Sequence, residues 1–250
     1  MTTYTFTPIA DALGAKGTFA FGINDAGEIA GFYNDSSGKP HGLLYSAGNY
    51  TTLNDPLGVE GTFVYGINDL GQIVGGYEDS SGLFHGLHYT GSTYITLNDP
   101  LGAEGTSANH INNAGQIVGH YLDSSGAAHG FLHSGGTYVT LNDPLGARGT
   151  DATGINDLGQ IVGHYYDSSG TSHGFSYYGG TYTTLDDPLG AEGTHANGIN
   201  DAGQIVGTYE TCARIVLDFE YCSVILPIRS MDEVDDDAAA HWSRGTVPVR

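Results

Sequence analysis

The sequence predicts an all-β fold, a five-bladed β-propeller, on three observations. A string of the form I-N-[DN]-[AL]-G-[QE]-I-[VA]-G occurs five times, and each occurrence begins 44 residues after the one before it. Each full copy contains four short runs rich in Val, Ile, Thr, Tyr and Phe, bounded by Gly or Asp. None of these runs has a helical period. A repeat of roughly 40 to 50 residues with four strands is typical of a propeller blade.

The copy that begins at Gly149 shows the expected elements in order. Strands are predicted over residues 151–156, 160–166, 172–178 and 181–185. The first two connections each begin with Asn or Asp and end with glycine, as a tight hairpin turn requires. The D-P-L-G segment that follows the fourth strand is predicted to link one copy to the next, because proline presets its first torsion angle. The copies begin at Gly17, Gly61, Gly105, Gly149 and Gly193.

The two ends of the chain set the blade count. Residues 5–17 align with residues 181–193, so the chain begins with the fourth strand of a copy. The fifth copy has its first two strands and loses the pattern after Tyr209. We therefore predict a ring that closes when the N-terminal strand pairs with the last blade, which leaves no exposed sheet edge. A straight solenoid is the alternative, and the split copy argues against it.

Residues 1–230 are predicted to form a single propeller domain, and residues 231–250 a disordered acidic tail. The composition changes abruptly after Glu210, where both cysteines and the only tryptophan occur. Alternation over residues 215–221 and an apolar run over 224–228 allow two more strands. This region is either a degraded end of the fifth copy or a purposeful cap.

Several strings resemble a known family. INDAGQIVG over residues 199–207, DSSG followed by the triplets at His129 and His173, and the TLNDPLGA link are similar to the bacterial HAF-type extracellular repeat family. The resemblance implies a propeller-like and often exported protein, with no agreed activity and no catalytic residues. An extracellular location follows from it. The first residues lack a positively charged and an apolar segment, so no cleavable secretion signal is predicted and a cytoplasmic location stays open.

Charge and composition exclude several partners. The formal net charge is −21 and the chain has only seven Lys and Arg residues, which argues against nucleic acid and anionic membranes. No segment approaches the ~18 consecutive apolar residues of a spanning helix, so no membrane insertion is expected. We expect a monomer whose partner is a carbohydrate or a protein surface.

A histidine recurs at the start of the third strand in every full copy. Symmetry places these side chains one blade apart, whereas metal ligands converge within ~2.1 Å of one ion. We therefore expect a structural role, with each imidazole packed on a neighbouring blade and hydrogen bonded to a turn, and no metal. The turn carboxylates could supply calcium ligands, but no copy has the spacing of a dedicated calcium loop. No cofactor is predicted, with calcium the open alternative. The histidines are His41, His85, His129 and His173.

The repeats do not predict an enzyme. An acid and a base need different environments, and near-identical copies provide near-identical ones. The turn serines lack a G-x-S-x-G context. We predict instead a binding module, lectin-like and directed at carbohydrate or a surface, because aromatic faces beside polar side chains can hold sugar rings. The alternative is a structural or protein-interaction scaffold with no small-molecule ligand. The candidate ligand-binding residues are Tyr77, Tyr121, Tyr165, His120 and His164.

The first strand of each copy differs most in sequence. In a propeller this strand lines the central channel. Its variation therefore reflects either drift in a roomy channel or adjustment to a ligand there.

Overall fold

The computed structural model describes residues 8–9, 13–211 and 222–226 of the chain. All helix and strand assignments in these residues are β-strands, which confirms the all-β prediction. Each of the first four copies forms an antiparallel meander in which each strand pairs with the next along the chain. The first two meanders consist of β1 (Thr18–Ile23), β2 (Ile29–Asn34), β3 (Pro40–Ser46), β4 (Asn49–Leu53), β5 (Gly61–Ile67), β6 (Ile73–Glu78), β7 (Phe84–Tyr89) and β8 (Tyr94–Leu97).

The next two meanders repeat this order and are joined to their successors by single parallel bridges, from Ala128 to Gly149 and from Ser172 to Gly193. They consist of β9 (Gly105–Ile111), β10 (Ile117–Leu122), β11 (Ala128–Ser134), β12 (Thr137–Leu141), β13 (Gly149–Ile155), β14 (Ile161–Tyr166), β15 (Ser172–Tyr178) and β16 (Thr181–Leu185). The strands predicted for the Gly149 copy are thus found within about two residues of their expected ends.

The fifth copy contributes β17 (Gly193–Ile199), β18 (Ile205–Glu210) and β19 (Cys222–Leu226). The backbone of β19 pairs with β18 as a third strand does in the other copies, which agrees with the strand expected near residues 224–228. Residues 215–221, most of the predicted closing strand at the N-terminus and the predicted tail over 231–250 lie outside the described residues. Pro8 and Ile9 are described and belong to no strand. Closure into a five-bladed ring therefore stays a prediction.

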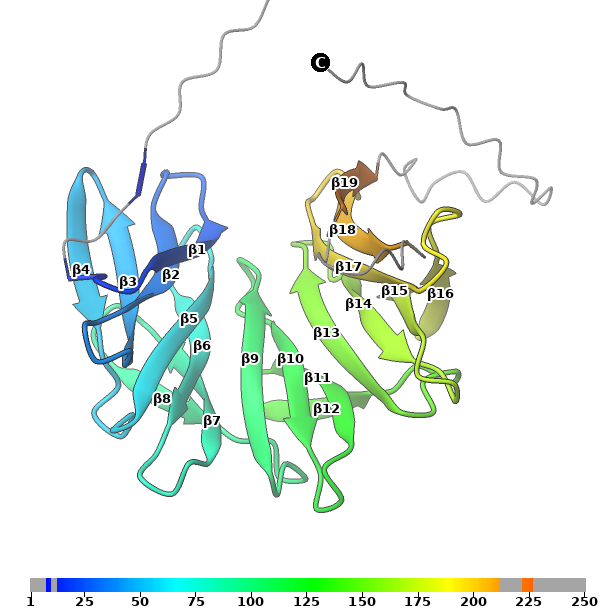
Figure 1. Ribbon diagram of the computed structural model, residues 1–250, viewed down its shortest axis with the longest axis horizontal. Helices are drawn as coiled ribbons and strands as arrows, with labels where there is room; N and C mark the ends of the chain where they lie inside the picture. Colours follow the sequence, from blue (N-terminus) through cyan, green and yellow to red (C-terminus); the bar gives the residue numbers. More distant parts are fainter. Residues whose placement is uncertain (1–7, 10–12, 212–221, 227–250) are drawn as a thin grey trace, which may run out of the picture.

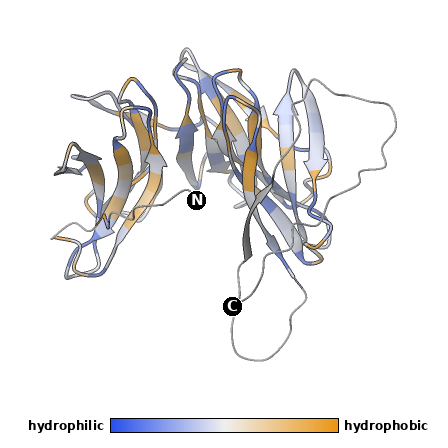
Figure 2. Ribbon diagram, turned by 90° about the horizontal axis from the view of Figure 1, so that it is seen from above, coloured by the Kyte–Doolittle hydropathy of each residue, from blue (hydrophilic) through white to orange (hydrophobic). Residues whose placement is uncertain are grey.

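The single bridges join the last three copies into one 11-stranded sheet, beside the two four-stranded sheets of the first two copies; below, the sheet of a copy means the strands of that copy. The copies follow one another along an arc, with the first strand of each on the inner side and the fourth strand of the first four copies outside (Figure 1). The core lies between neighbouring sheets. Val74 on β6, for example, packs with Ala108 and Ile111 on the first strand of the next copy. Figure 2 shows the hydrophobic positions concentrated within the strands. Each fully buried aliphatic side chain of this kind contributes about 1.5 to 3 kcal/mol.

The recurring I-N-D-x-G-Q string stabilises a turn and a sheet junction together. Asn68 Oδ1 accepts hydrogen bonds from the backbone of its own turn, including the Gln72 N–H at 2.9 Å. Its amide nitrogen donates to the Asn112 carbonyl of the next sheet at 3.0 Å. Gly71 closes the turn at φ 69°, a conformation that glycine adopts without strain. The motif is therefore structural in each copy where these contacts occur.

Candidate ligand-binding channel

The recurring histidines belong to a structural network inside their own copy. His129 Nε2 lies 3.0 Å from Asp123 Oδ2 in the preceding turn, and Nδ1 lies 3.0 Å from Asn142 Oδ1 in the link to the next copy. Its ring stacks on Tyr121 with centroids 5.1 Å apart. The expected hydrogen bond to a turn is thus present, while the stacking partner lies in the same sheet and not in a neighbouring one. His41, His85 and His173 have equivalent partners.

The three candidate tyrosines are buried in the sheets. Tyr77, Tyr121 and Tyr165 are each at most 3% exposed. Their hydroxyl groups pair with a threonine hydroxyl on the fourth strand of the same copy, at 2.9 to 3.2 Å. Alternation along a strand predicts two faces but does not say which face is covered. Here a histidine ring and the neighbouring sheet cover the tyrosines, so we assign them to the core and not to a ligand surface.

The two candidate histidines lie at sheet junctions on the inner side. His120 Nδ1 is 3.1 Å from Asp151 Oδ1 on the next sheet. Burial disfavours the charged ring, but attraction to Asp151 and the hydrogen bond outweigh it, so the pKa of His120 is raised. The ring centroid of His164 lies 4.3 Å from that of His195, and its buried Nδ1 has no hydrogen-bond partner among the described residues. Burial lowers the pKa of His164 to about 4, so this ring is neutral at pH 7.

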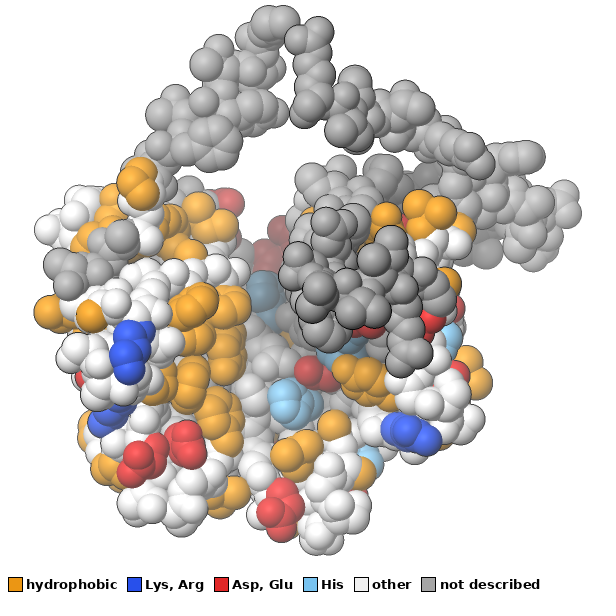
Figure 3. Space-filling model, in the orientation of Figure 1, with side chains coloured by type: hydrophobic (Ala, Val, Ile, Leu, Met, Phe, Trp, Pro, Cys, Tyr) orange, Lys and Arg blue, Asp and Glu red, His pale blue; other side chains and the backbone are white. Residues whose placement is uncertain are grey.

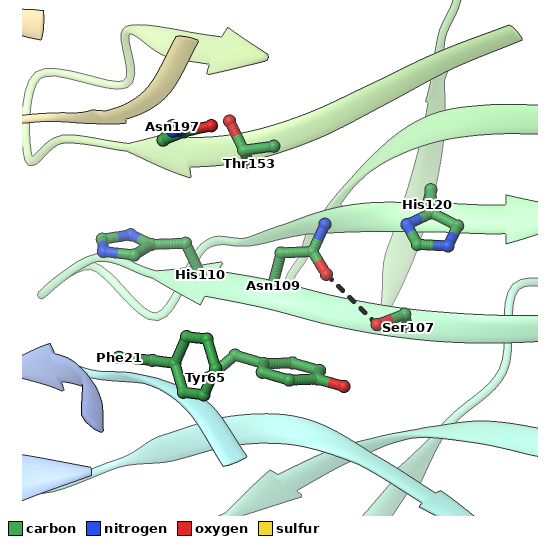
Figure 4. Close-up of a pocket in the computed structure, with 8 residues that line it drawn as sticks. All are labelled: Phe21, Tyr65, Ser107, Asn109, His110, His120, Thr153 and Asn197. Carbon is green, nitrogen blue, oxygen red and sulfur yellow. Dashed lines mark hydrogen bonds between the residues drawn. The ribbon is translucent and has the colours of Figure 1, made fainter. Parts of the chain in front are cut away.

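A cavity of about 350 Å³ opens on the inner side of the arc. His120 is one of its lining residues, whereas the three candidate tyrosines are absent from the lining. Figure 4 shows side chains from several sheets facing one another across it. The lining residues are Phe21, Tyr65, Ser107, Asn109, His110, His120, Thr153 and Asn197.

Five of these residues occupy the same unusual place in their strands. The register between the first and second strand of every copy shifts by one residue, and the residue left out of the pairing lies in the cavity lining. A β-bulge of this kind bends the strand and redirects a side chain. The fold therefore places one side chain per copy in the lining of this cavity, which we call the channel. These bulge residues are Phe21, Tyr65, Asn109, Thr153 and Asn197.

The two sides of the channel differ in chemistry. The first two sheets contribute an aromatic cluster, in which Phe21 meets Tyr65 edge to face at 5.6 Å and Phe32 lies 5.3 Å from Phe63. The later sheets contribute amides, hydroxyls and imidazoles. Figure 3 shows hydrophobic side chains gathered along the inner edge of the first two sheets, and histidine side chains bordering the hollow between the sheets.

Three polar groups of the cavity lining have no hydrogen-bond partner in the described part of the chain: the Tyr65 hydroxyl, the Asn197 amide and His110 Nδ1. Figure 4 shows the Tyr65 hydroxyl directed away from Phe21, toward the end of the cavity where Ser107 and His120 lie. Burial raises the pKa of Tyr65 to about 12, so its hydroxyl stays protonated and can donate. The amide of Asn109, in contrast, is used within the protein, since its nitrogen donates to Asp151 Oδ1 and the Ala152 carbonyl.

Ser107, His120 and Asp151 come together at the third junction, a grouping that the sequence did not indicate. His120 pairs with Asp151 through Nδ1, and Ser107 lies directly opposite His120 on the neighbouring strand. The Ser107 hydroxyl, however, donates to Asn109 Oδ1 at 3.1 Å (Figure 4). The structure gives no hydrogen bond between Ser107 and His120.

Within the described ranges, no three His, Cys, Asp or Glu side chains are grouped as a metal site would require. The described part of the chain also has no helix of sufficient length and hydropathy to span a bilayer.

Comparisons with known proteins identify solved structures but no family. No family model matches the chain, and no curated protein matches it. A mutant of AofleA from Arthrobotrys oligospora aligns over 89% of this chain and 77% of its own, with 13% identity and a TM-score of 0.49. A mutant of the Aleuria aurantia lectin, solved with α-methyl-L-fucoside, aligns over 86% and 79% with 10% identity and a TM-score of 0.49. The BP39L lectin from Burkholderia pseudomallei aligns over 89% and 73% with 12% identity and a TM-score of 0.42. These values do not establish a shared ligand.

Proposed function

We propose that the chain is a non-enzymatic binding module that holds a carbohydrate in its channel. The observation that carries the proposal is a cavity of about 350 Å³ with Phe21 and Tyr65 on one side and Thr153 and Asn197 on the other. A sugar ring has an apolar C–H face and a rim of hydroxyl groups. An aromatic wall opposite a wall of amides and hydroxyls complements both parts of such a ligand.

The free polar groups fit a neutral ligand that both donates and accepts hydrogen bonds. The Tyr65 hydroxyl and the Asn197 amide line the cavity without protein partners among the described residues, so a ligand can pair with them without breaking a protein hydrogen bond. Thr153 Oγ1 donates to the Ala196 carbonyl at 2.6 Å and keeps its lone pairs as acceptors. The hydroxyl groups of a sugar can both donate hydrogen bonds to and accept them from such amides and hydroxyls.

The hydrogen bonds around Ser107 support binding in preference to catalysis. A nucleophilic serine needs a base that accepts its proton, with the two groups within hydrogen-bond reach. Ser107 donates to Asn109 instead. The Asp151 carboxylate raises the pKa of His120 despite burial, and the ring is hydrogen bonded to Asp151 and not to Ser107. The trio therefore fixes the position of Asn109 and the third junction.

The proposal is tested by screening the protein on a broad glycan array, with and without calcium, and measuring affinity for the strongest ligand by calorimetry. Phe21→Ala and Asn197→Ala alter exposed side chains, so the fold should be retained. Each should weaken binding by about tenfold or more, equivalent to about 1.4 kcal/mol. Tyr178→Ala, an exposed aromatic outside the channel, is the matched control and should leave the affinity unchanged.

Unchanged affinity in both channel variants would place the ligand elsewhere on the protein. Absence of binding to any glycan by the parent protein would reject the carbohydrate proposal and favour the scaffold alternative.

A further inference from the structure

The end of the arc formed by β18, called the far end below, exposes one half of the kind of interface that joins neighbouring sheets within the arc. At each internal junction, one residue on the second strand of a sheet packs against the first strand of the next sheet. Val206 occupies the equivalent place on β18 and is 45% exposed. The four internal residues, all 0% exposed, are Ala30, Val74, Val118 and Val162.

The end of the arc formed by β1, called the near end below, exposes the other half of this interface. Ala20 and Ile23 on β1 are exposed, and Ile23 is 68% accessible. In the following copies the residues at these two places, among them Ala108 and Ile111, are buried against the preceding sheet, except for Ile199 of the fifth copy, which is half-buried. The apolar surface on β1 is therefore the same receiving surface that buries a valine at the internal junctions.

A series of hydrogen bonds between equivalent turn residues, called the Asn ladder below, gives these junctions a direction. In each of the first four copies the turn asparagine donates its amide N–H to the carbonyl of the equivalent asparagine 44 residues later, at 3.0 to 3.2 Å. The following residue donates its backbone N–H to a side-chain oxygen 44 residues later, at 2.7 to 2.8 Å. Each of these bonds runs from one sheet to the next one in the chain. The exception is the Asn113 side-chain amide, which donates back to Asp69 Oδ2 at 2.7 Å as well as forward to Asp157 Oδ2 at 2.8 Å.

The ladder leaves complementary groups at the two ends. Within the described residues, the second amide N–H of Asn200 and the backbone N–H of Asp201 have no acceptor from a following sheet. At the other end, no described residue of another sheet donates to the Asn24 carbonyl, which accepts only the Gly27 N–H of its own turn, or to the Asp25 carboxylate. The far end offers donors and an exposed valine, and the near end offers acceptors and an exposed apolar strand.

We infer that the β18 end of one molecule docks on the β1 end of a second copy, head to tail. The two ends lie apart across the open side of the arc (Figure 1), and their exposed side chains show that neither covers the other. Bringing them together within one chain would require internal junctions to shift. Those junctions are built from fully buried side chains, and packed interfaces of this kind do not deform continuously. A second copy provides the missing surface without any such change.

An interface between two different surfaces is heterologous, so copies add in one direction and form a closed ring or an open chain. The inference differs from the monomer that the sequence led us to expect. It also differs from closure of a single-chain ring, in which β18 and β1 would meet in one molecule.

The experiment uses two variants that each block one end, Ile23→Lys and Val206→Lys. Both side chains are exposed, so the urea midpoint of each should match that of the parent. The mass of the parent, measured by light scattering after gel filtration, should rise with concentration from 26.1 kDa to at least twice that value. Each variant alone should stay at the monomer mass. Val139→Lys, on an outer strand, is the matched control and should behave as the parent.

An equimolar mixture of the two variants gives the decisive readout. The first retains a free β18 end and the second a free β1 end, so the mixture should form a one-to-one dimer and no larger species. If the parent associates but the mixture does not, another surface is responsible. If the parent stays monomeric at every concentration, the inference is overturned, and a fall in the urea midpoint of both variants would then indicate that the ends meet within one chain. Ile23→Gln and Val206→Gln repeat the test if a lysine variant does not fold.

Discussion

Truncating Tyr121 should destabilise the protein without acting on the channel directly. The ring of Tyr121 is buried and stacks on His129, and its hydroxyl shares a hydrogen bond of 3.1 Å with the Thr140 hydroxyl. Replacing a buried aromatic ring by alanine removes its burial and leaves a cavity, which costs about 3 to 5 kcal/mol. Tyr121→Phe removes only the hydroxyl and its hydrogen bond to Thr140, which costs about 0.5 to 1.5 kcal/mol. The difference between the two variants measures the contribution of the ring.

Urea unfolding of the parent and both variants measures these losses. With a slope of about 1 to 3 kcal/mol per molar urea, Tyr121→Ala should lower the midpoint by at least about 1 M. Tyr178→Ala, which truncates an exposed tyrosine, should change the free energy of unfolding by no more than about 0.5 kcal/mol. A loss below about 1 kcal/mol for Tyr121→Ala, with weakened glycan binding, would show that this ring contacts ligand and that our assignment to the core is mistaken.

Two predictions concern pH. Hydrogen bonds from Ser125 and His129 lower the pKa of Asp123 below its ordinary value of 3.8, so the charged carboxylate stabilises the fold fully above pH 3.8 and this contribution is lost as the pH falls below that value. In Asp123→Asn the free energy of unfolding, measured by urea titration at several pH values, should therefore fall less steeply in acid than in the parent. Burial opposes charging of His173, but the carboxylate of Asp186 outweighs it and raises the pKa of the ring, so this contribution is complete below about pH 6.5 and is lost as the pH rises through the raised pKa. Asp186→Asn should lower the pKa of His173 in an NMR titration, and an unchanged value would contradict the assigned cause.

The strands could be predicted because their signals are local. Alternating apolar residues, a leading Asn or Asp and a closing glycine define each hairpin without reference to the rest of the chain. Because the sequence repeats, the strands predicted for one copy are expected at the equivalent positions of the others. Glycine also has a local reason in the I-V-G string, because a side chain at Gly119 would meet the Ser107 carbonyl across the strand pair. The fifth copy departed from this pattern, and its third strand was therefore only loosely expected.

The candidate site could be predicted only in part, because the channel depends on bulges and on how sheets pack. The five bulges that turn Phe21 and its equivalents inward leave no distinct pattern in the sequence. The recurring tyrosines looked suitable for a ligand, yet the third strand of their own sheet places a histidine over each ring in the full copies. Variation in the first strand was the one signal that pointed to the channel, and it did not show which side chains enter it.

The position of that variation explains how nearly identical copies can build a site that is not symmetric. The Asn ladder and the buried aliphatic residue on the second strand hold neighbouring sheets together, and the Tyr–His stack stabilises each sheet from within. The four full copies share all three features. The bulge residue takes no part in this network in the first copy or the fifth, since Phe21 is 56% exposed and Asn197 is also exposed. A change there alters the channel at little cost in stability. Aromatic rings in the first two copies and polar groups in the last three therefore give the channel two unlike walls, which equal copies could not provide.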